Sequence, residues 1–177
     1  NVLLDAWAGR HLGVPYDDAG NWGRSGQINA PLLEQLLQQP YFSQTGPKST
    51  GRELFNLKWL DQQLASHAAI TAADVQATLS ELTAISISQS ILRENVLLDR
   101  LAVCGGGAHN LYLLERLAAL LPAMQVTTTD QLGVPADWME AMAFAWLAHC
   151  FVEKIAANRP EVTGARGLRV LGALYPA

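Results

Sequence analysis

Cysteine, charge and long hydrophobic runs are scarce in this sequence, and each shortage excludes a class of protein. The 177 residues include only two cysteines, and 16% of them are charged, with a net charge of −4. No run of Lys and Arg provides the basic face that is typical of nucleic-acid-binding proteins. No uninterrupted apolar segment reaches the roughly 18 residues that a membrane-spanning helix needs. We therefore expect neither a nucleic-acid nor a membrane partner.

The cysteines and histidines are too dispersed to form a recognisable metal or disulfide motif. Cys104 and Cys150 lie far apart and form no C-x-x-C pattern. They are typical of reduced core residues in an intracellular protein. The four histidines are scattered and form no H-E-x-x-H motif. We therefore expect no metal ion that is held entirely by protein side chains.

The first half of the chain is predicted to be mainly helical. Half of all residues are hydrophobic, which is a globular composition. In the first half these residues recur at helical spacing, with Gly- and Pro-rich loops between the helices. Helices are predicted over 2–12, 31–39, 52–65 and 72–95, with Asn1 and Thr71 as N-caps and with loops over 13–31 and 40–51.

The second half follows a strand–helix–strand–helix–strand order. The helix over 137–157 is apolar almost all round, which favours a central position. This order predicts an α/β fold, with a small parallel or mixed sheet and flanking helices. One strand is predicted in "DRLAVCGG", and two more cover "MQVTTT" and "LRVLGAL". The helix "NLYLLERLAALL" carries an apolar stripe of Leu111, Leu114, Leu117 and Leu121, which Leu113 and Leu120 widen.

The segment "VCGGGAHN", residues 103–110, places three glycines between a predicted strand and a predicted helix. Glycines let a ligand approach the backbone, and the free N–H groups of a helix start favour negative charge. A Walker loop is excluded, because the turn lacks G-K-[ST] and "GPKS" at 46–49 has an intervening Pro47 and no preceding strand. The turn therefore has two functional readings, besides a plain strand-to-helix turn in which Asn110 caps the helix.

The first functional reading is a Rossmann dinucleotide turn. Gly105 and Gly107 fit that motif and Asp130 lies at about the required distance, but Asn110 occupies the third glycine position. The second is G-G-G-A-x-N, which resembles the adenosine-side turn of actin-like ATPases and sugar kinases. Both readings, and the purely structural one, remain open from spacing alone.

The segment "DWME" contains a carboxylate in unusual surroundings. Glu140 is the only acidic residue between Trp138 and Phe151 on a helix that is otherwise apolar. A buried carboxylate without a partner costs several kcal/mol, roughly, so it would need one. Asp137 and Glu140 have the spacing of a capping box. Alternatively, Glu140 accepts hydrogen bonds from the hydroxyl groups of a polar ligand.

Two further segments permit both a structural and a functional interpretation. In "KSTGRE", Thr50 and Glu53 have capping-box spacing, which we favour, whereas Lys48 and Arg52 could bind anions. "TTTD" at 127–130 ends a predicted strand, where ligands of α/β proteins usually gather. Its simpler interpretation is β-propensity followed by a turn aspartate.

Taken together, these segments resemble the anhydro-N-acetylmuramic acid kinases. The similarity runs in order along the whole chain and includes segments specific to that family. The segments are "NVLLDAW", "KSTGRELFN", "VCGGGAHN", "VTTTDQLGV", "DWMEAMAFAWLA", "VTGA" and the terminal "VLGALYPA".

The resemblance implies the helix-rich C-terminal lobe of an actin/hexokinase-like (ribonuclease H-like) kinase. Residues 1–95 would form a mainly helical part and 96–177 an α/β nucleotide-binding part. Asn1 resembles the last residue of the family's D-T-G-P-G-N motif. The general-base aspartate and the N-terminal lobe would then lie upstream, with no catalytic residue in this chain, which would be inactive alone.

The resemblance also implies an activity and its site residues. A bacterial, cytoplasmic enzyme of peptidoglycan recycling would use ATP and Mg²⁺ to phosphorylate O6 of 1,6-anhydro-N-acetylmuramic acid and open the anhydro ring with water. It would release N-acetylmuramic acid 6-phosphate and would form a homodimer. Glu140 would bind the sugar, no residue of this chain would hold a metal alone, and the adenosine side of ATP would bind Gly105, Gly106, Gly107 and Asn110.

Two other functions stay as alternatives from the residues alone. A Rossmann-type dinucleotide-binding enzyme would bind NAD(P) through the glycine turn. A non-catalytic helical interaction module would use the glycines only to reverse the chain direction. The family resemblance favours the kinase over both.

Overall fold

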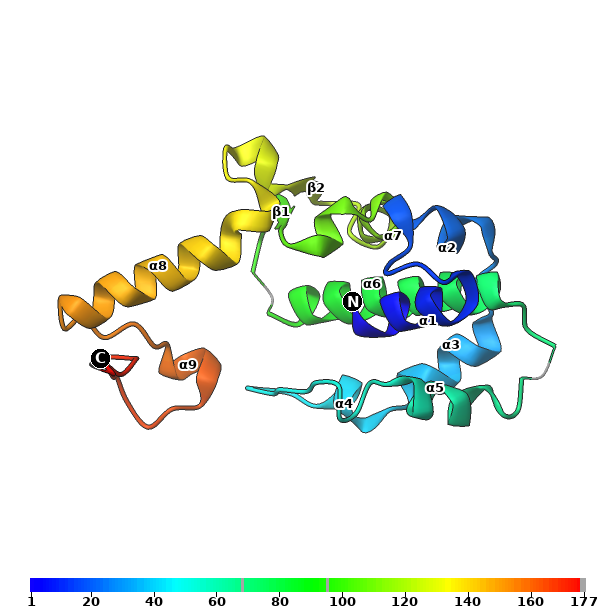
Figure 1. Cartoon of the computed structure of the whole chain (residues 1–177), viewed down its shortest axis with the longest axis horizontal. Helices are drawn as coiled ribbons and strands as arrows, with labels where there is room; N and C mark the ends of the chain where they lie inside the picture. Colours follow the sequence, from blue (N-terminus) through cyan, green and yellow to red (C-terminus); the bar gives the residue numbers. More distant parts are fainter. Residues whose placement is uncertain (68, 95, 176–177) are drawn as a thin grey trace.

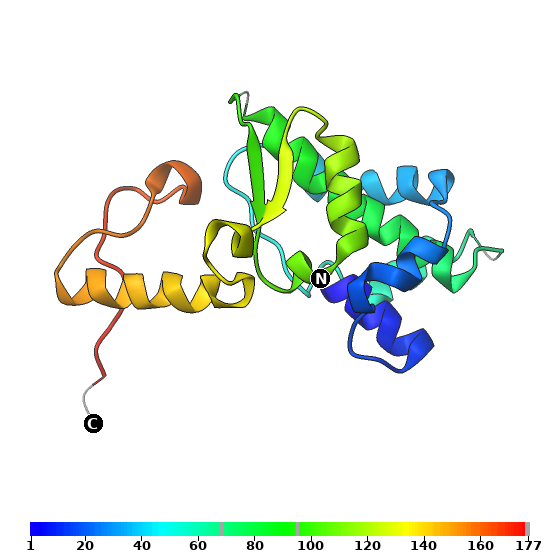
Figure 2. The same ribbon diagram turned by 90° about the horizontal axis from the view of Figure 1, so that it is seen from above.

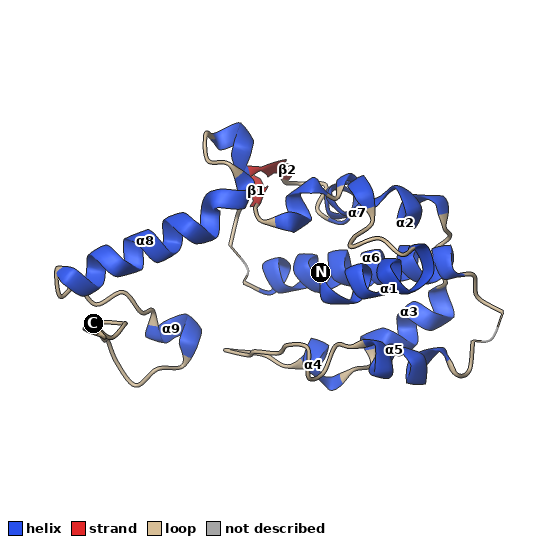
Figure 3. Cartoon of the chain, viewed as in Figure 1, coloured by secondary structure: helices blue, strands red, loops and turns tan. Residues whose placement is uncertain are grey.

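The computed structural model describes residues 1–67, 69–94 and 96–175 as a helix-rich α/β chain with a two-stranded sheet (Figure 3). Within these ranges, no helix combines the length and apolar character that crossing a bilayer would require. The helices are α1 (Val2–Leu12), α2 (Asn21–Ser25), α3 (Ala30–Leu37), α4 (Pro40–Ser43), α5 (Leu57–Leu64), α6 (Ala72–Arg93), α7 (Leu111–Leu120), α8 (Met139–Val152) and α9 (Pro160–Thr163); the strands are β1 (Arg100–Val103) and β2 (Gln125–Thr128).

Helix α6 is the central element of the larger part of the molecule (Figures 1 and 2). It contacts α1, α2, α3 and α7, and every residue over 75–82 is buried. Thr71 caps its start by accepting a hydrogen bond from the Asp74 N–H, as the sequence predicted. The predicted helix extended to residue 95, which lies outside the described residues.

The main hydrophobic core lies where α1, α3 and α5 pack against α6. The predicted Asn1 cap is confirmed, since its side chain accepts from the N–H groups of Leu3 and Leu4. Apolar side chains three or four residues apart then face the same side of each helix. The buried cluster comprises Leu3, Leu4, Trp7, Leu32, Leu36, Trp59, Leu60, Val75, Leu79 and Leu82.

The sheet pairs β1 with β2 in parallel, and α7 forms the connection between them. Arg100 pairs with Gln125 and Val103 with Thr128. Leu113 and Leu117 of α7 are buried against Ala84 of α6 in a second core cluster. Leu111 was predicted to belong to the buried stripe of α7, but it is 52% exposed. The buried face of α7 includes Leu113 instead of Leu111.

Helix α8 is not central, contrary to the prediction. It extends away from the α6 core in both views (Figures 1 and 2), and Cys150 is its one buried residue. Phe144 is 70% exposed and Trp146 is 49% exposed. An all-round apolar sequence indicates that a helix needs covering, but no described element of this chain covers most of α8.

The predicted third strand is absent from the described residues. Residues 168–174 have no regular secondary structure, and Leu168 and Leu174 are exposed. A strand requires a hydrogen-bonded neighbour, and within the described chain β2 and β1 pair only with each other. The strand propensity of "LRVLGAL" is therefore not realised.

The predicted helix over 52–65 begins only at Leu57. The Asn56 side chain accepts from the Trp59 N–H at 3.0 Å and caps α5, so the predicted Thr50–Glu53 capping box was wrong. In the preceding loop, the prediction missed the four-residue helix α4. The wrong start of α5 reflects short-range competition between alternative caps, which sequence spacing does not resolve.

The two thiols differ in environment. Both cysteines are free, as predicted, but only Cys150 is buried. Cys104 is exposed directly after β1, so the prediction of a core residue was wrong for this position.

Candidate functional site

A cavity of about 580 Å³ opens between the start of α1, the loop before α2 and the glycine turn. It lies at the carboxyl end of β1, which is where α/β proteins usually bind ligands. It has both polar and apolar walls and is lined by Asn1, Leu4, Asp5, Tyr16, Asp17, Asp18, Ala19, Gly106, Gly107, His109, Asn110, Leu113 and Asp137. Gly106, Gly107 and Asn110, three of the four predicted nucleotide-binding residues, are therefore together in one cavity.

The glycine turn leaves its backbone accessible. Gly105 has a φ of +68°, and its N–H donates to the Ala136 carbonyl at 2.9 Å, so this glycine anchors the turn. Residues Gly106–His109 form a 3-10 turn whose first N–H groups have no acceptor within the turn. No described atom lies within 4 Å of a Cβ built on Gly106. The turn can therefore present backbone N–H donors to an anionic ligand.

Asn110 ends the turn and begins α7. Its side-chain oxygen accepts from the Leu113 N–H at 2.9 Å, which confirms the predicted cap. This oxygen also packs against Gly20, where a Cβ would meet it at 2.1 Å. Gly20 has a φ of +71° and thus combines a left-handed backbone with a close approach. The loop before α2 therefore buttresses the glycine turn.

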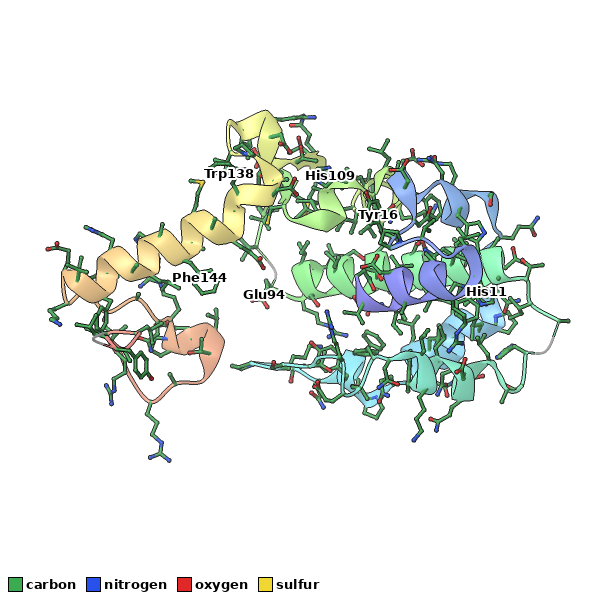
Figure 4. All side chains as sticks on the ribbon, viewed as in Figure 1. His11, Tyr16, Glu94, His109, Trp138 and Phe144 are labelled. Carbon is green, nitrogen blue, oxygen red and sulfur yellow. The ribbon has the colours of Figure 1, made fainter. Side chains whose placement is uncertain are left out.

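The segment Asp137–Glu140 forms no capping box, contrary to one of the two interpretations. No side chain caps α8, and Asp137 instead lies 2.9 Å from His109 Nε2. His109 is labelled in Figure 4. Glu140 is exposed, so it carries no burial cost. Glu140 is not among the residues that line the cavity, whereas Asp137, three residues earlier in the chain, does line it. The Glu140 carboxylate is accessible to a ligand.

The His109–Asp137 contact raises the pKa of His109. The hydrogen bond that the protonated His109 ring donates to the Asp137 carboxylate is the largest cause, and the charges of Asp137 and Asp130 add to the effect. Since the folded-state pKa is raised, this contact stabilises the fold below the unfolded-state pKa. The stabilisation is lost as the pH rises through the folded-state pKa.

We expect the substitution Asp137→Asn to lower the pKa of His109 towards its ordinary value, because the amide carries no charge. The measurement is an NMR titration of the His109 ring in the complete protein. Glu140→Gln is the matched control and should leave the midpoint of the His109 titration unchanged. An unchanged midpoint in Asp137→Asn would show that this contact does not control the histidine.

Several cavity residues were missed by reasoning from the sequence, and three polar ones come from one loop. Tyr16, Asp17 and Asp18 lie in a segment that was predicted only as a loop. Asp17 is buried and accepts from the N–H groups of Trp22 and Gly23, so it caps α2 and fixes the loop. The only sequence signal was the pair of adjacent aspartates within a glycine-rich loop.

The cavity suits a metal ion that is coordinated partly by a bound small molecule and partly by the protein. Among the described residues, no group of three or more His, Cys, Asp or Glu side chains could hold a metal ion. The cavity nevertheless carries the carboxylates of Asp5, Asp18 and Asp137. Mg²⁺ is usually held by one or two carboxylates together with phosphates and water. This donor set therefore fits a magnesium–phosphate complex better than a protein cage.

The remaining predicted segments have mainly structural contacts. Lys48 donates to the carbonyls of Tyr41 and Gln44, so it closes its own loop. Asp130 accepts from the Ala136 N–H at 3.3 Å, which lowers the pKa of its carboxyl group and braces the turn. In this position Asp130 serves the turn rather than a ribose, which argues against the Rossmann reading. Arg52 lies at a different cavity from the glycine turn.

The fold and the cavity together define the chain as a helix-rich α/β protein with a cavity at a strand-to-helix glycine turn. Comparison with known sequences then gives the family. The chain belongs to the anhydro-N-acetylmuramic acid kinases, because the profile of that family matches residues 1–177. The resemblance predicted from the sequence motifs is thus confirmed. The dinucleotide and interaction-module alternatives gain no support.

Individual relatives agree with the family match. The anhydro-N-acetylmuramic acid kinase of Pseudomonas putida is 59% identical over 177 residues, covering 100% of this chain and 49% of its own length. The kinase of the same name from Pseudomonas fluorescens is 57% identical over 176 residues, covering 99% of this chain and 48% of its own length. The chain therefore spans about half the length of these curated relatives.

Proposed function

We propose that the complete protein containing this chain phosphorylates O6 of 1,6-anhydro-N-acetylmuramic acid with ATP. Water would open the anhydro ring and N-acetylmuramic acid 6-phosphate would be released. The observation that carries the proposal is the family match over residues 1–177. This chain would be the C-terminal lobe of an actin/hexokinase-like kinase, with 1–95 as its helical part and 96–177 as its nucleotide-binding part. Since the chain spans half of its relatives, activity would require the complete protein.

The glycine turn would bind the adenosine side of ATP through Gly105, Gly106, Gly107 and Asn110. Support comes from the open space at Gly106 and from the position of three of these residues in one cavity. That cavity also carries several aspartates, which would repel free ATP. ATP should therefore bind with Mg²⁺, which would neutralise charge on the phosphates during transfer.

Glu140 would bind the sugar by accepting hydrogen bonds from its hydroxyl groups. Its exposed carboxylate is consistent with that role. Substrate positioning supplies much of the rate in phosphoryl transfer, because the protein does little covalent chemistry itself. The protein would act in the bacterial cytoplasm in peptidoglycan recycling, and as a homodimer.

The test is ADP release by the complete protein with Mg²⁺–ATP and either 1,6-anhydro-N-acetylmuramic acid or N-acetylmuramic acid. We expect turnover that depends on the anhydro sugar. Gly106→Val should weaken ADP binding at least about tenfold with the fold intact, because its side chain would enter the open space of the turn. Glu140→Ala should raise the sugar KM or lower kcat with nucleotide affinity unchanged.

Gly9→Val is the matched control, because Gly9 is exposed on α1 outside the cavity. It should preserve both ADP binding and turnover. Absence of turnover with either sugar would contradict the proposed substrate. Unaltered ADP affinity in Gly106→Val would contradict the proposed role of the glycine turn.

A further inference from the structure

Ala19 has a strained backbone and lines the cavity at the glycine turn. Its φ is +52°, and among the described residues Lys154 is the one other non-glycine residue with a positive φ. A left-handed backbone brings the Cβ of an L-residue too close to the following carbonyl oxygen, so residues other than glycine rarely adopt it. Such strain persists only where neighbouring contacts enforce it, and it is concentrated at functional sites.

Asp17 fixes the chain on both sides of Ala19. Its carbonyl accepts from the Gly20 N–H at 3.1 Å, which closes a turn around Ala19. Its buried carboxylate accepts from the N–H groups of Trp22 and Gly23 at 2.9 and 2.8 Å. Because these bonds close short loops, the backbone between them has little freedom to relax. The anchoring of Asp17 thus imposes the left-handed conformation of Ala19.

The consequence of this conformation is the contact between Gly20 and Asn110. Gly20 follows Ala19 directly, and the position of a Cβ on Gly20 lies 2.1 Å from Asn110 Oδ1. The same oxygen accepts from the Leu113 N–H and caps α7. Because Asn110 ends the glycine turn, the direction of the chain at Ala19 determines where the turn can lie. The strained residue, its neighbour Gly20 and the turn that opens into the cavity are therefore joined by direct contacts.

We propose that Ala19 is a positioning residue of the nucleotide site, because its left-handed backbone holds Gly20 against Asn110 and so fixes the glycine turn in its ligand-binding conformation. This inference rests on the proposed function for the identity of the ligand, and it adds a residue that acts through another. A turn that is already fixed reduces the ordering that binding would otherwise require. With glycine at position 19 the loop would populate further conformations, and only a fraction of the molecules would present a competent turn.

The test is the substitution Ala19→Gly in the complete protein, with three measurements. Glycine adopts a left-handed backbone without strain, so the midpoint of urea denaturation should not fall. Hydrogen exchange without ligand should become at least about threefold faster at the Leu113 N–H, whose acceptor is Asn110. Calorimetric titration should show ADP binding that is at least about threefold weaker. A role confined to the local stability of the loop would change neither the exchange at Leu113 nor the ADP affinity.

Lys154→Gly is the matched control, because Lys154 has a φ of +59° but is exposed after the end of α8 and does not line this cavity. It removes the same kind of strain and should change neither the exchange at Leu113 nor the ADP affinity. Unchanged exchange at Leu113 in Ala19→Gly would overturn the proposal. Faster exchange with unaltered affinity, in a protein that binds ADP, would overturn it as well. If the unmodified protein binds no ADP, the proposed function fails, whereas faster exchange in Ala19→Gly would still support positioning of the turn by Ala19.

Discussion

Replacing Arg116 with methionine is expected to lower the free energy of unfolding by about 3 kcal/mol. Arg116 on α7 donates to both carboxylate oxygens of Glu81 on α6, at 2.6 and 3.1 Å. The Glu81 side chain is only 7% exposed. Without the guanidinium, its negative charge would be buried between the two helices with no positive partner. The loss is large because the charge remains in the core after its partner is removed.

Arg24→Met is the matched control for this effect. Arg24 pairs with Glu115 of the same helix α7, but these side chains are 36% and 60% exposed. Exposed pairs contribute less than about 1 kcal/mol, because water solvates both charges when they separate. Urea denaturation of both variants measures the difference. Equal losses would mean that burial of Glu81 does not govern the stability of the contact between α6 and α7.

Replacing Gly20 with alanine is expected to cost about 2 to 3 kcal/mol and to weaken ADP binding. The left-handed backbone at Gly20 disfavours any Cβ by about 1 to 2 kcal/mol. The new methyl group would also meet Asn110 Oδ1 at 2.1 Å and displace the cap of α7, which is worth about 1 kcal/mol. Because Asn110 also ends the glycine turn, the ligand site would shift with it.

Gly13→Ala separates the two causes. Gly13 has the same φ of +71°, but no described atom lies within 4 Å of its Cβ position. This variant should lose only the backbone cost of about 1 to 2 kcal/mol and should keep its ADP affinity. The measurements are urea denaturation and calorimetric titration with ADP. If both variants lose the same stability and both retain ADP affinity, contact with Asn110 does not support the turn.

The helix caps show which contacts can be predicted from the local sequence. Asn1, Thr71 and Asn110 all cap the helices for which they were predicted. Each of these bonds joins a side chain to an N–H within three residues, so the sequence contains both partners. Two candidate capping boxes failed, one through competition from a nearby cap and the other through a distant contact. Asn56 caps α5 in place of Thr50, and Asp137 contacts His109 from a distant segment.

The family and the type of most elements were determined by the sequence alone. Hydrophobic periodicity located α1, α3, α6 and α7, and both strands were found from apolar and β-branched runs. The candidate glycine turn was also visible in the sequence, because three consecutive glycines are disfavoured within a strand or a helix and so indicate a turn between them. These features depend on residues within one turn or one strand of each other.

Only the tertiary structure decided which residues share a cavity. Asn1, Asp18, Gly106 and Asp137 come from four separate segments and line one space. The structure also left α8 largely exposed and gave "LRVLGAL" no strand partner among the described residues, although their composition favours burial. The physical reason is that the composition of a segment determines how strongly burial of its surface is favoured. Which neighbour buries that surface depends on packing between segments that are distant in the chain.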